Sequence, residues 1–364
     1  MAAPQFRSIQ CLRGLAASAV ALSHLFIIET KYTTGPTILP TIVQNGVAGV
    51  DLFFVISGFI ITTVTTGSFR REGETSRFLL HRIIRIYPIY WFYFFLVLGI
   101  YVANPAMVNS NYGAPNLLTS FLLLPHANPP LLAVAWTLVY ELFFYCMFAA
   151  GLRWLKEQQL IAALLIWAAI TVIGVVTLRP TGEQPILNLV FSPYILEFLA
   201  GCLVAKAVPR VGRSIGAISL VSGVVLIGAG TLAVDAGVVP PLDGWRGVLI
   251  YGIGSAFLVA GCAGLERNGA LRRIPPSLVR LGDASYSLYL SHVLTLSAVG
   301  RVWHHCFDSP SLINHLALLI VASSAAVAWG LLSHRFIEAP LLRFLRATMD
   351  RSMRIMPART SHPA

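Results

Sequence analysis

Residues 12–28 read LRGLAASAVALSHLFII, and this apolar stretch with two ionisable side chains decides the fold class. With its apolar flanks it reaches the ~20 residues that one bilayer-spanning α-helix needs. Arg13 and His24 are close to three helical turns apart, so both side chains share one face, roughly 16 Å apart along the axis. Ionisable side chains in membrane helices usually face a protein interior or a water-filled path. The stretch therefore predicts a membrane helix whose polar face lines a cavity.

The composition extends this prediction to the whole chain. Of its 364 residues, 56% are hydrophobic and 11% are charged, and the mean hydropathy is +0.74. Soluble globular chains carry roughly 25% charged residues, so we expect an all-α integral membrane protein with membrane lipid around it. The formal charge of +11 is explained by Lys and Arg that orient membrane helices, and no nucleic-acid partner is expected.

Ten apolar runs are long enough to span a membrane, which predicts a bundle of ten transmembrane helices. The runs lie near 9–28, 46–65, 83–103, 133–152, 159–178, 187–206, 214–233, 246–265, 284–302 and 314–334. The segment 117–124, between Pro115 and Pro125, is short and predicts a re-entrant or interfacial piece; if it spans, the count is eleven. We expect one transmembrane domain over residues 1–340 and a basic cytoplasmic tail over 341–364.

Basic side chains alternate between loops along this series of spans. Arginines and lysines gather after the second, fourth, sixth, eighth and tenth spans, whereas the long segment 104–132 has none. Cytoplasmic loops are enriched in Lys and Arg. With ten spans, both termini are therefore expected in the cytoplasm.

This orientation places the intramembrane polar residues at two depths. The inner group is basic and consists of Arg13, Arg82 and Arg85. The group nearer the outside holds carboxylates and histidines, namely His24, Asp51, Glu141, Glu197 and His292. Other roles stay open, since Arg82 and Arg85 would also serve as positive anchors. Buried Glu141, Glu197 and His292 would also hold helices together through hydrogen bonds.

Six blocks of the sequence, in order, carry a family resemblance. They are SIQCLRGLAASAVALSHL (8–25), GVAGVDLFFVISGFIIT (46–62), RIIRIYPIYW (82–91), AWTLVYELFFY (135–145), SYSLYLSHV (285–293) and RFIEAP (335–340). Together they resemble the membrane acyltransferase family 3, and most of all its exopolysaccharide-modifying, ExoZ-like branch. The blocks extend over nearly the whole chain.

The resemblance implies a multi-pass enzyme of the bacterial cytoplasmic (inner) membrane. It would move an acyl group, most often acetyl, from acyl-coenzyme A to a hydroxyl of an exopolysaccharide or another cell-surface glycan. Its acceptor or partners would include a lipid-linked saccharide and the polysaccharide assembly machinery. The family's Arg-x10-His element falls on Arg13 and His24, its Arg-x-x-Arg element on Arg82 and Arg85, and its glutamate on Glu141.

These matches suggest a division of roles. Arg82 and Arg85, helped by Arg13, would bind the phosphates of coenzyme A, because guanidinium groups pair bidentately with phosphate. His24 would act as general base or as an acyl-accepting nucleophile. Glu141 or Asp51 would orient it and complete the catalytic set, while Glu197 and His292 are candidates for substrate binding. No metal is expected, because the sequence has neither HExxH nor CxxC spacing.

Two other functions remain open at this point. Related family members acylate small hydrophobic glycosides such as macrolides, and the residues do not specify a sugar. A proton-coupled saccharide carrier would also use buried Glu and His, although paired repeats typical of many transporters are not evident.

Overall fold

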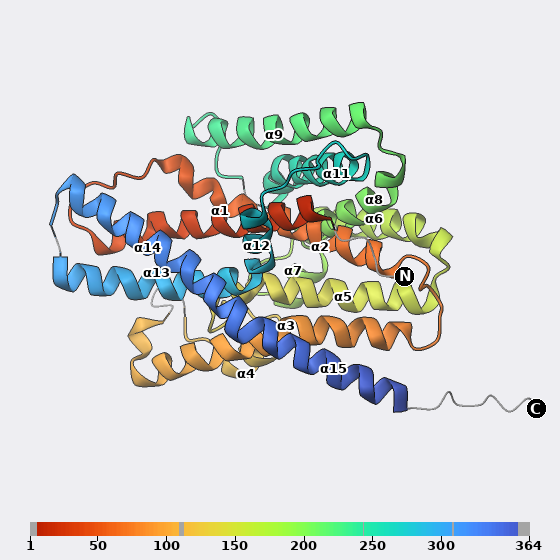
Figure 1. The fold of residues 1–364 in the computed structure, drawn as a ribbon, viewed down its shortest axis with the longest axis horizontal. Coiled ribbons are helices and arrows are strands. Elements are labelled where there is room, and N and C mark those ends of the chain that lie inside the picture. Colours follow the sequence, from red (N-terminus) through yellow and green to blue (C-terminus); the bar gives the residue numbers. More distant parts are fainter. Residues whose placement is uncertain (1–5, 109–112, 243, 308, 356–364) are drawn as a thin grey trace, which may run out of the picture.

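The structure is a computed structural model that describes residues 6–108, 113–242, 244–307 and 309–355. These residues form helices and loops with no β-strand, which confirms the all-α prediction (Figure 1). The α-helices are α1 (Arg7–Tyr32), α2 (Gly49–Thr65), α3 (Glu74–Ala103), α4 (Leu117–Leu122), α5 (Trp136–Trp154), α6 (Leu160–Leu178), α7 (Pro185–Val190), α8 (Tyr194–Ala207), α9 (Arg213–Asp235), α10 (Gly244–Gly247), α11 (Ile253–Arg267), α12 (Pro276–Asp283), α13 (Ser285–Phe307), α14 (Leu312–Ser333) and α15 (Ala339–Ile355). The 3-10 helices are η1 (Thr41–Ala48), η2 (Pro105–Met107), η3 (Ala133–Ala135), η4 (Glu157–Gln159) and η5 (Val208–Arg210), and η6 (Val248–Gly252) and η7 (His334–Glu338) are π-helical turns.

Nine helical segments of the described chain are long and apolar enough to cross a membrane. They coincide with nine of the ten predicted spans and confirm a multi-pass membrane protein. The remaining predicted span, 284–302, is helix α13, which has 23 residues. It is long enough to cross a bilayer, but serines, tyrosines and histidines reduce its hydropathy, so it lies outside the nine.

The short segment 117–124 does not span. Its helix α4 has six residues and ends at Leu123, whose φ is 54°. Side chains of α3 hold it by its backbone, since Trp91 Nε1 donates to the Phe121 carbonyl at 3.1 Å and the Tyr87 hydroxyl donates to the Leu122 carbonyl at 2.8 Å. The segment is therefore a short piece fixed against α3.

Helix α1 lies in the middle of the bundle. It packs against α2, α11, α12, α13 and α14, and Figure 1 shows α9 and α11 on one side of it and α3 and α4 on the other. Helices α6 and α9 expose most of their apolar side chains at the periphery. Arg13 and His24 thus lie on a central helix, where neighbouring helices can supply polar partners.

The contact between α2 and α8 depends on two glycines. A Cβ atom at Gly58 would lie 2.0 Å from the Phe198 carbonyl oxygen, and one at Gly201 would lie 2.0 Å from the Val55 carbonyl oxygen. Small residues let membrane helices approach closely. This close approach brings Glu197 of α8 beside Asp51 of α2.

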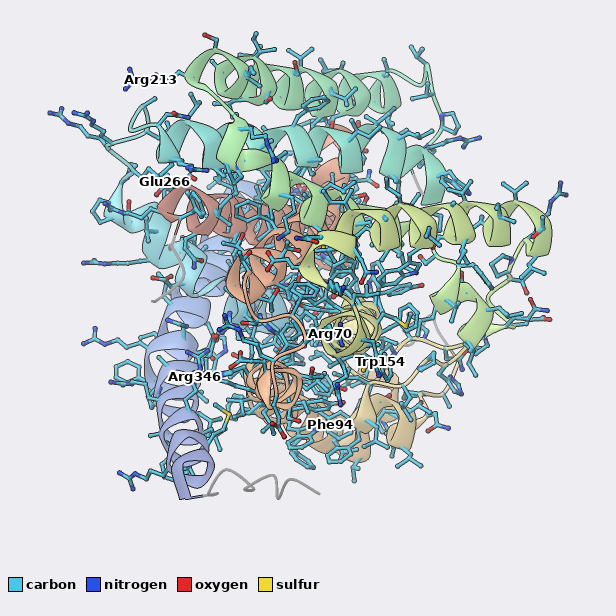
Figure 2. The ribbon with its side chains drawn as sticks, turned by 90° about the vertical axis from the view of Figure 1, so that its right-hand side faces the viewer. Arg70, Phe94, Trp154, Arg213, Glu266 and Arg346 are labelled. Atoms are coloured by element: carbon cyan, nitrogen blue, oxygen red, sulfur yellow. The ribbon has the colours of Figure 1, made fainter. Side chains whose placement is uncertain are left out.

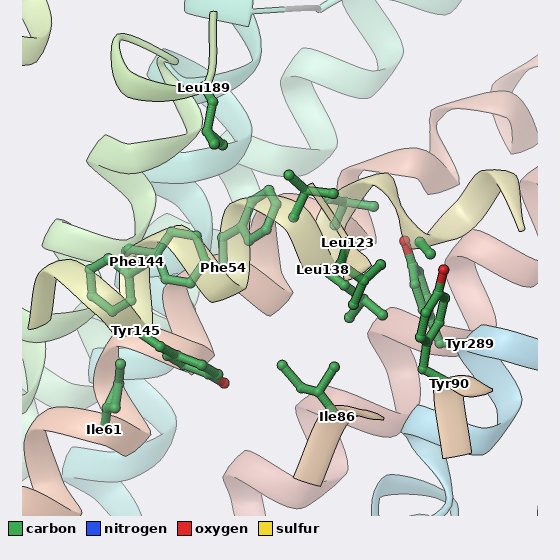
Figure 3. Close-up of a cluster of buried hydrophobic side chains, with 14 of the residues drawn as sticks. Phe54, Ile61, Ile86, Tyr90, Leu123, Leu138, Phe144, Tyr145, Leu189 and Tyr289 are labelled. Atoms are coloured by element: carbon green, nitrogen blue, oxygen red, sulfur yellow. The ribbon is translucent and has the colours of Figure 1, made fainter. Parts of the chain in front are cut away.

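Aromatic side chains fill the space between α2, α3, α5 and α8. Phe144 stacks on Phe198 with ring centroids 4.2 Å apart, and Phe54 contacts Phe198 at 4.8 Å. Figure 3 shows Phe54, Phe144 and Tyr145 of this cluster, with the Tyr145 hydroxyl pointing away from Phe144. The packed rings form a rigid wall for the cavity described below.

The basic loops gather at one end of the molecule. Figure 2 views the structure from this end, which carries Arg70, Arg213 and Arg346. The predicted tail begins as a helix: α15 follows α14 through the π-helical turn η7 and packs against α3. Placement of this end in the cytoplasm remains a prediction of the charge pattern.

The glycine contact predicts that Gly58→Ala destabilises the protein. Because the new methyl group meets backbone atoms that cannot move away easily, the free energy of unfolding should fall by about 1–3 kcal/mol. Thermal unfolding in detergent micelles measures this. Gly228→Ala is the matched control, since a Cβ there in α9 meets no atom within 4 Å; equal midpoints for both variants would contradict the close packing of α2 on α8.

Candidate active site

A cavity of about 900 Å³ opens between α2, α3, α5, α13 and α15. Six arginines line it, namely Arg13, Arg71, Arg77, Arg82, Arg85 and Arg346. The acidic lining residues are Glu74 and Glu141. Figure 3 shows three further lining residues, Tyr145, Ile86 and Tyr289, on separate helices. We name this the basic cavity; its surplus of positive charge suits an anionic ligand.

Arg85 is already engaged by a carboxylate. Its guanidinium pairs with Glu338 of η7, and its Cζ lies 5.1 Å from the Tyr286 ring centroid. The second oxygen of Glu338 accepts hydrogen bonds from Ser287 Oγ at 2.6 Å and from His334 Nδ1 at 3.1 Å. Arg85 therefore helps fix α3 to α13 and η7, in addition to lining the basic cavity.

Arg82 forms no ion pair with any described carboxylate. Its Nε is buried without a hydrogen-bond partner among the described residues. Its Cζ lies 5.4 Å from the Phe78 ring and 5.5 Å from the Tyr145 ring. The rings position the guanidinium and leave its hydrogen bonds available to a ligand. Of the two arginines of the Arg-x-x-Arg element, Arg85 is thus paired with a carboxylate, whereas Arg82 has none among the described residues.

Glu141 and Arg13 also belong to the basic cavity. Glu141 accepts hydrogen bonds from Ser57 Oγ at 2.9 Å and from the Tyr145 hydroxyl. Arg13 Nη1 donates to Gln10 Oε1 at 3.4 Å. Glu141 therefore lies with the arginines, and the structure does not place it against His24, the position expected of an orienting carboxylate.

The partner of His24 is His292. His24 Nδ1 lies 2.9 Å from the Val20 carbonyl and 3.3 Å from His292 Nε2. His292 Nδ1 lies 2.7 Å from the Tyr289 carbonyl. A carbonyl can only accept, so in the neutral rings each Nδ1 carries the proton. His292 Nε2 then accepts from His24, and the free lone pair of His24 lies on Nε2.

Tyr289 connects the histidine pair with the basic cavity. It lines that cavity, and its ring lies 5.8 Å from the His292 ring and 5.8 Å from the Phe53 ring. Its hydroxyl hydrogen-bonds Thr137 Oγ1 and the Val134 carbonyl, each at 2.9 Å. The basic cavity therefore ends one aromatic ring away from the histidine pair.

Asp51 and Glu197 form a separate buried pair. The two carboxyl groups lie close enough to influence each other, and both oxygens of Glu197 are buried without a hydrogen-bond partner among the described residues. Two carboxylates can share a hydrogen bond only when one holds a proton. Neither residue lines the basic cavity, so the structure does not bring this pair together with Arg82 or Glu141.

Sequence reasoning missed two buried acidic residues. Glu338 lies in the RFIEAP block, where its position within an apolar stretch was the available signal. Glu29 is fully buried near the end of α1 and accepts from His315 Nδ1 at 2.7 Å and from the Ile38 amide at 2.7 Å. Its partner His315 is 286 positions away in sequence, and Glu29 holds the segment after α1 against α14.

No metal site emerges from the part of the chain that the structure describes. Within it, no group of three or more His, Cys, Asp or Glu side chains lies close enough together to hold an ion.

The Arg85 pair predicts that Glu338→Gln is strongly destabilising. Glu338 is fully buried and Arg85 is 22% exposed, so the substitution leaves a largely buried arginine without its carboxylate, which costs about 3 kcal/mol in unfolding free energy. Arg82→Gln in the same helix should cost much less, because Arg82 has no carboxylate partner. Thermal unfolding of both purified variants measures the difference; equal losses would contradict the assignment of Glu338 as the partner.

Comparison with known proteins adds an independent finding. A family model described as an acyltransferase domain matches residues 6–335. The chain is similar to the exopolysaccharide production protein ExoZ of Rhizobium meliloti (strain 1021), with 32% identity over 83% of this chain and 91% of that protein. It is 26% identical to nodulation protein 10 of Rhizobium leguminosarum bv. viciae, over 84% of this chain and 85% of that protein.

A third relative is longer than this chain. O-acetyltransferase OatA of Staphylococcus aureus (strain NCTC 8325 / PS 47) is 24% identical over 92% of this chain and 57% of that protein. No solved structure matches the chain.

Proposed function

Since the chain belongs to the acyltransferase family whose domain covers residues 6–335, and is therefore an acyltransferase, we propose that it transfers acetyl from acetyl-coenzyme A to a hydroxyl of a cell-surface polysaccharide. The names of two relatives support this acceptor and this group, because one is an exopolysaccharide production protein and another an O-acetyltransferase. The proposed location is the bacterial cytoplasmic membrane, beside the machinery that assembles the polysaccharide.

The basic cavity is the observation that carries the proposal. Its volume of about 900 Å³ falls within the ~300–1,000 Å³ typical of ligand sites. Coenzyme A carries several phosphate charges, which Arg82, Arg13 and the arginines of the predicted cytoplasmic loops would bind. Arg85 contributes charge but is already paired with Glu338. The donor would enter from the cytoplasm.

Helix α1 links the donor site to the histidine pair. Arg13 lines the basic cavity, and His24 lies about 16 Å further along the same helix. The thin pantetheine arm would extend along α1, past Phe53 and Tyr289, and present the thioester near His24 Nε2. The acceptor hydroxyl would approach from the other side of the membrane, so coenzyme A itself need not cross.

His24 would supply proton transfer at this point. As general base, Nε2 removes the acceptor hydroxyl proton while the oxygen attacks the thioester carbonyl; the carbon–sulfur bond breaks and the imidazolium returns the proton to the thiolate. In the other route, Nε2 attacks the thioester carbonyl and the carbon–sulfur bond breaks with release of the thiolate; the hydroxyl oxygen then attacks the acetyl group, the nitrogen–carbon bond breaks, and the hydroxyl proton passes to the thiolate. Both routes require a lone pair on Nε2, which His292 preserves by accepting from Nδ1.

Arg82 is predicted to bind the donor. Arg82→Gln should raise the KM for acetyl-coenzyme A about tenfold or more, because a hydrogen bond to a charged phosphate contributes about 1.5–3 kcal/mol. Initial rates with purified protein in lipid vesicles measure this. Arg153→Gln, which removes an exposed arginine at the same end outside the basic cavity, is the control; a shared change in KM would point to general surface charge.

The histidine pair is predicted to govern kcat. His24→Ala should reduce transfer of radiolabelled acetyl to the saccharide by about 10²–10⁴-fold, the usual contribution of a general base. His292→Asn should lower kcat with little change in the KM for acetyl-coenzyme A, because His292 acts through His24. Equal transfer by wild type and His24→Ala would remove His24 from the mechanism, and a His292 effect confined to KM would remove its positioning role.

A further inference from the structure

A second cavity lies at the opposite end of α5 from the arginine-rich loops. Its volume is about 210 Å³, about seven times the ~30 Å³ of one water molecule, which gives room for a single sugar ring. It is bounded by three parts of the chain: residues 119–130 after the start of α4, the first turns of α5, and residues 182–189 around α7. We name it the amide–aromatic cavity.

The lining of this cavity is mixed, with polar side chains set among prolines and aliphatic residues. It contains no Lys, Arg, Asp or Glu, and its polar side chains include Trp136, Tyr140, Asn128, Asn188 and His126. Such a lining offers no charge to a phosphate and instead suits a neutral ligand with several hydroxyl groups. Aromatic faces pack against the C–H faces of sugar rings, while amides hydrogen-bond their hydroxyls.

Two of these polar groups are free to bind a ligand. The indole N–H of Trp136 and the side-chain amide of Asn188 form no hydrogen bond with another described residue. Two others are held in place, since Asn128 Nδ2 donates to the Ala114 carbonyl at 3.2 Å and the Tyr140 ring packs edge-on against the Trp136 ring, with centroids 5.7 Å apart. The cavity thus combines fixed walls with unpaired donors and acceptors.

The position of the cavity relative to the histidine pair determines what it can hold. Trp136 lines it, and the next residue on α5, Thr137, lines the basic cavity and bonds the Tyr289 hydroxyl at 2.9 Å. The two cavities therefore lie on different sides of the first turns of α5. A helix with its side chains is ~10–12 Å wide, so a sugar here is too distant to be the residue that reacts at His24.

We propose that the amide–aromatic cavity is a distal saccharide subsite, which binds a sugar residue further along the same glycan than the one receiving the acyl group. The proposal rests on the acyl transfer proposed above. The loops that line the amide–aromatic cavity lie at the predicted outer end of the molecule, where a polysaccharide would approach. The enzyme would accordingly prefer acceptors of two or more linked sugars, because only these occupy the subsite and reach His24 together.

Binding of sized saccharides tests the subsite directly. The surface polysaccharide of the organism that encodes the chain is stripped of O-acetyl groups, partly hydrolysed, tritiated at the reducing end and separated into fragments of one, two and four residues. Equilibrium binding to the protein in lipid nanodiscs then compares wild type with Asn188→Ala and Trp136→Phe. Gln184→Ala is the matched control, since it removes an exposed amide four residues from Asn188 and outside the cavity.

We expect the longer fragments to bind wild type more tightly than the single sugar does. Each subsite variant should weaken binding of the longer fragments about fivefold, the effect of one neutral hydrogen bond, whereas Gln184→Ala should match wild type. Trp136→Phe keeps an aromatic ring in place and guards against misfolding. Equal affinity for all fragment lengths, or wild-type affinity in both variants, would overturn the subsite.

Transfer of label from acetyl-coenzyme A in the same nanodiscs separates the two proposals. Binding that depends on Asn188 but is not followed by transfer would support the subsite and refute acetyl transfer. Transfer with binding that is independent of Asn188 and Trp136 would support acetyl transfer and refute the subsite.

Discussion

The structure depends on one constraint: an ionisable side chain inside a membrane needs either a protein partner or a polar cavity. Lipid offers no hydrogen bonds, so such a group is stabilised only by what the fold supplies. Arg85 finds Glu338, Glu29 finds His315, and His24 finds His292. Each pairing joins helices that are far apart in sequence, so these polar groups help determine how the helices pack.

The same pairings divide the basic residues into structural and available groups. Arg85 is balanced by a buried carboxylate, whereas Arg82 lies against aromatic rings without one. In the proposed function, an anionic donor would find at Arg82 a guanidinium that no described carboxylate occupies. The histidine pair lies beyond this charged region, behind Tyr289, where a neutral imidazole can keep its lone pair on Nε2. The arginines proposed to bind the donor and the histidine proposed as the base thus lie at different depths along α1.

Much of this arrangement was predictable from local pattern. Run length and hydropathy gave the helical spans, because a membrane helix satisfies its own backbone and needs only enough apolar residues. The blocks around Arg13, His24, Arg82 and Glu141 identified the family. The expected orienting partner of His24 was different, however. Glu141 bonds Ser57 and Tyr145, and Asp51 lies beside Glu197, because helix rotation and tilt decide which faces meet.

The sequence by itself determined the membrane class, the family and the residues able to do chemistry, since these follow from composition and from short motifs. Only the tertiary structure decided which of those residues meet. His292 is 268 positions from His24, and Glu338 is 253 positions from Arg85. Such pairs depend on how the helices approach, which glycines such as Gly58 and Gly201 permit. Hydropathy indicates which segments are apolar enough to lie in the membrane but carries no information about the side chain that a residue will face.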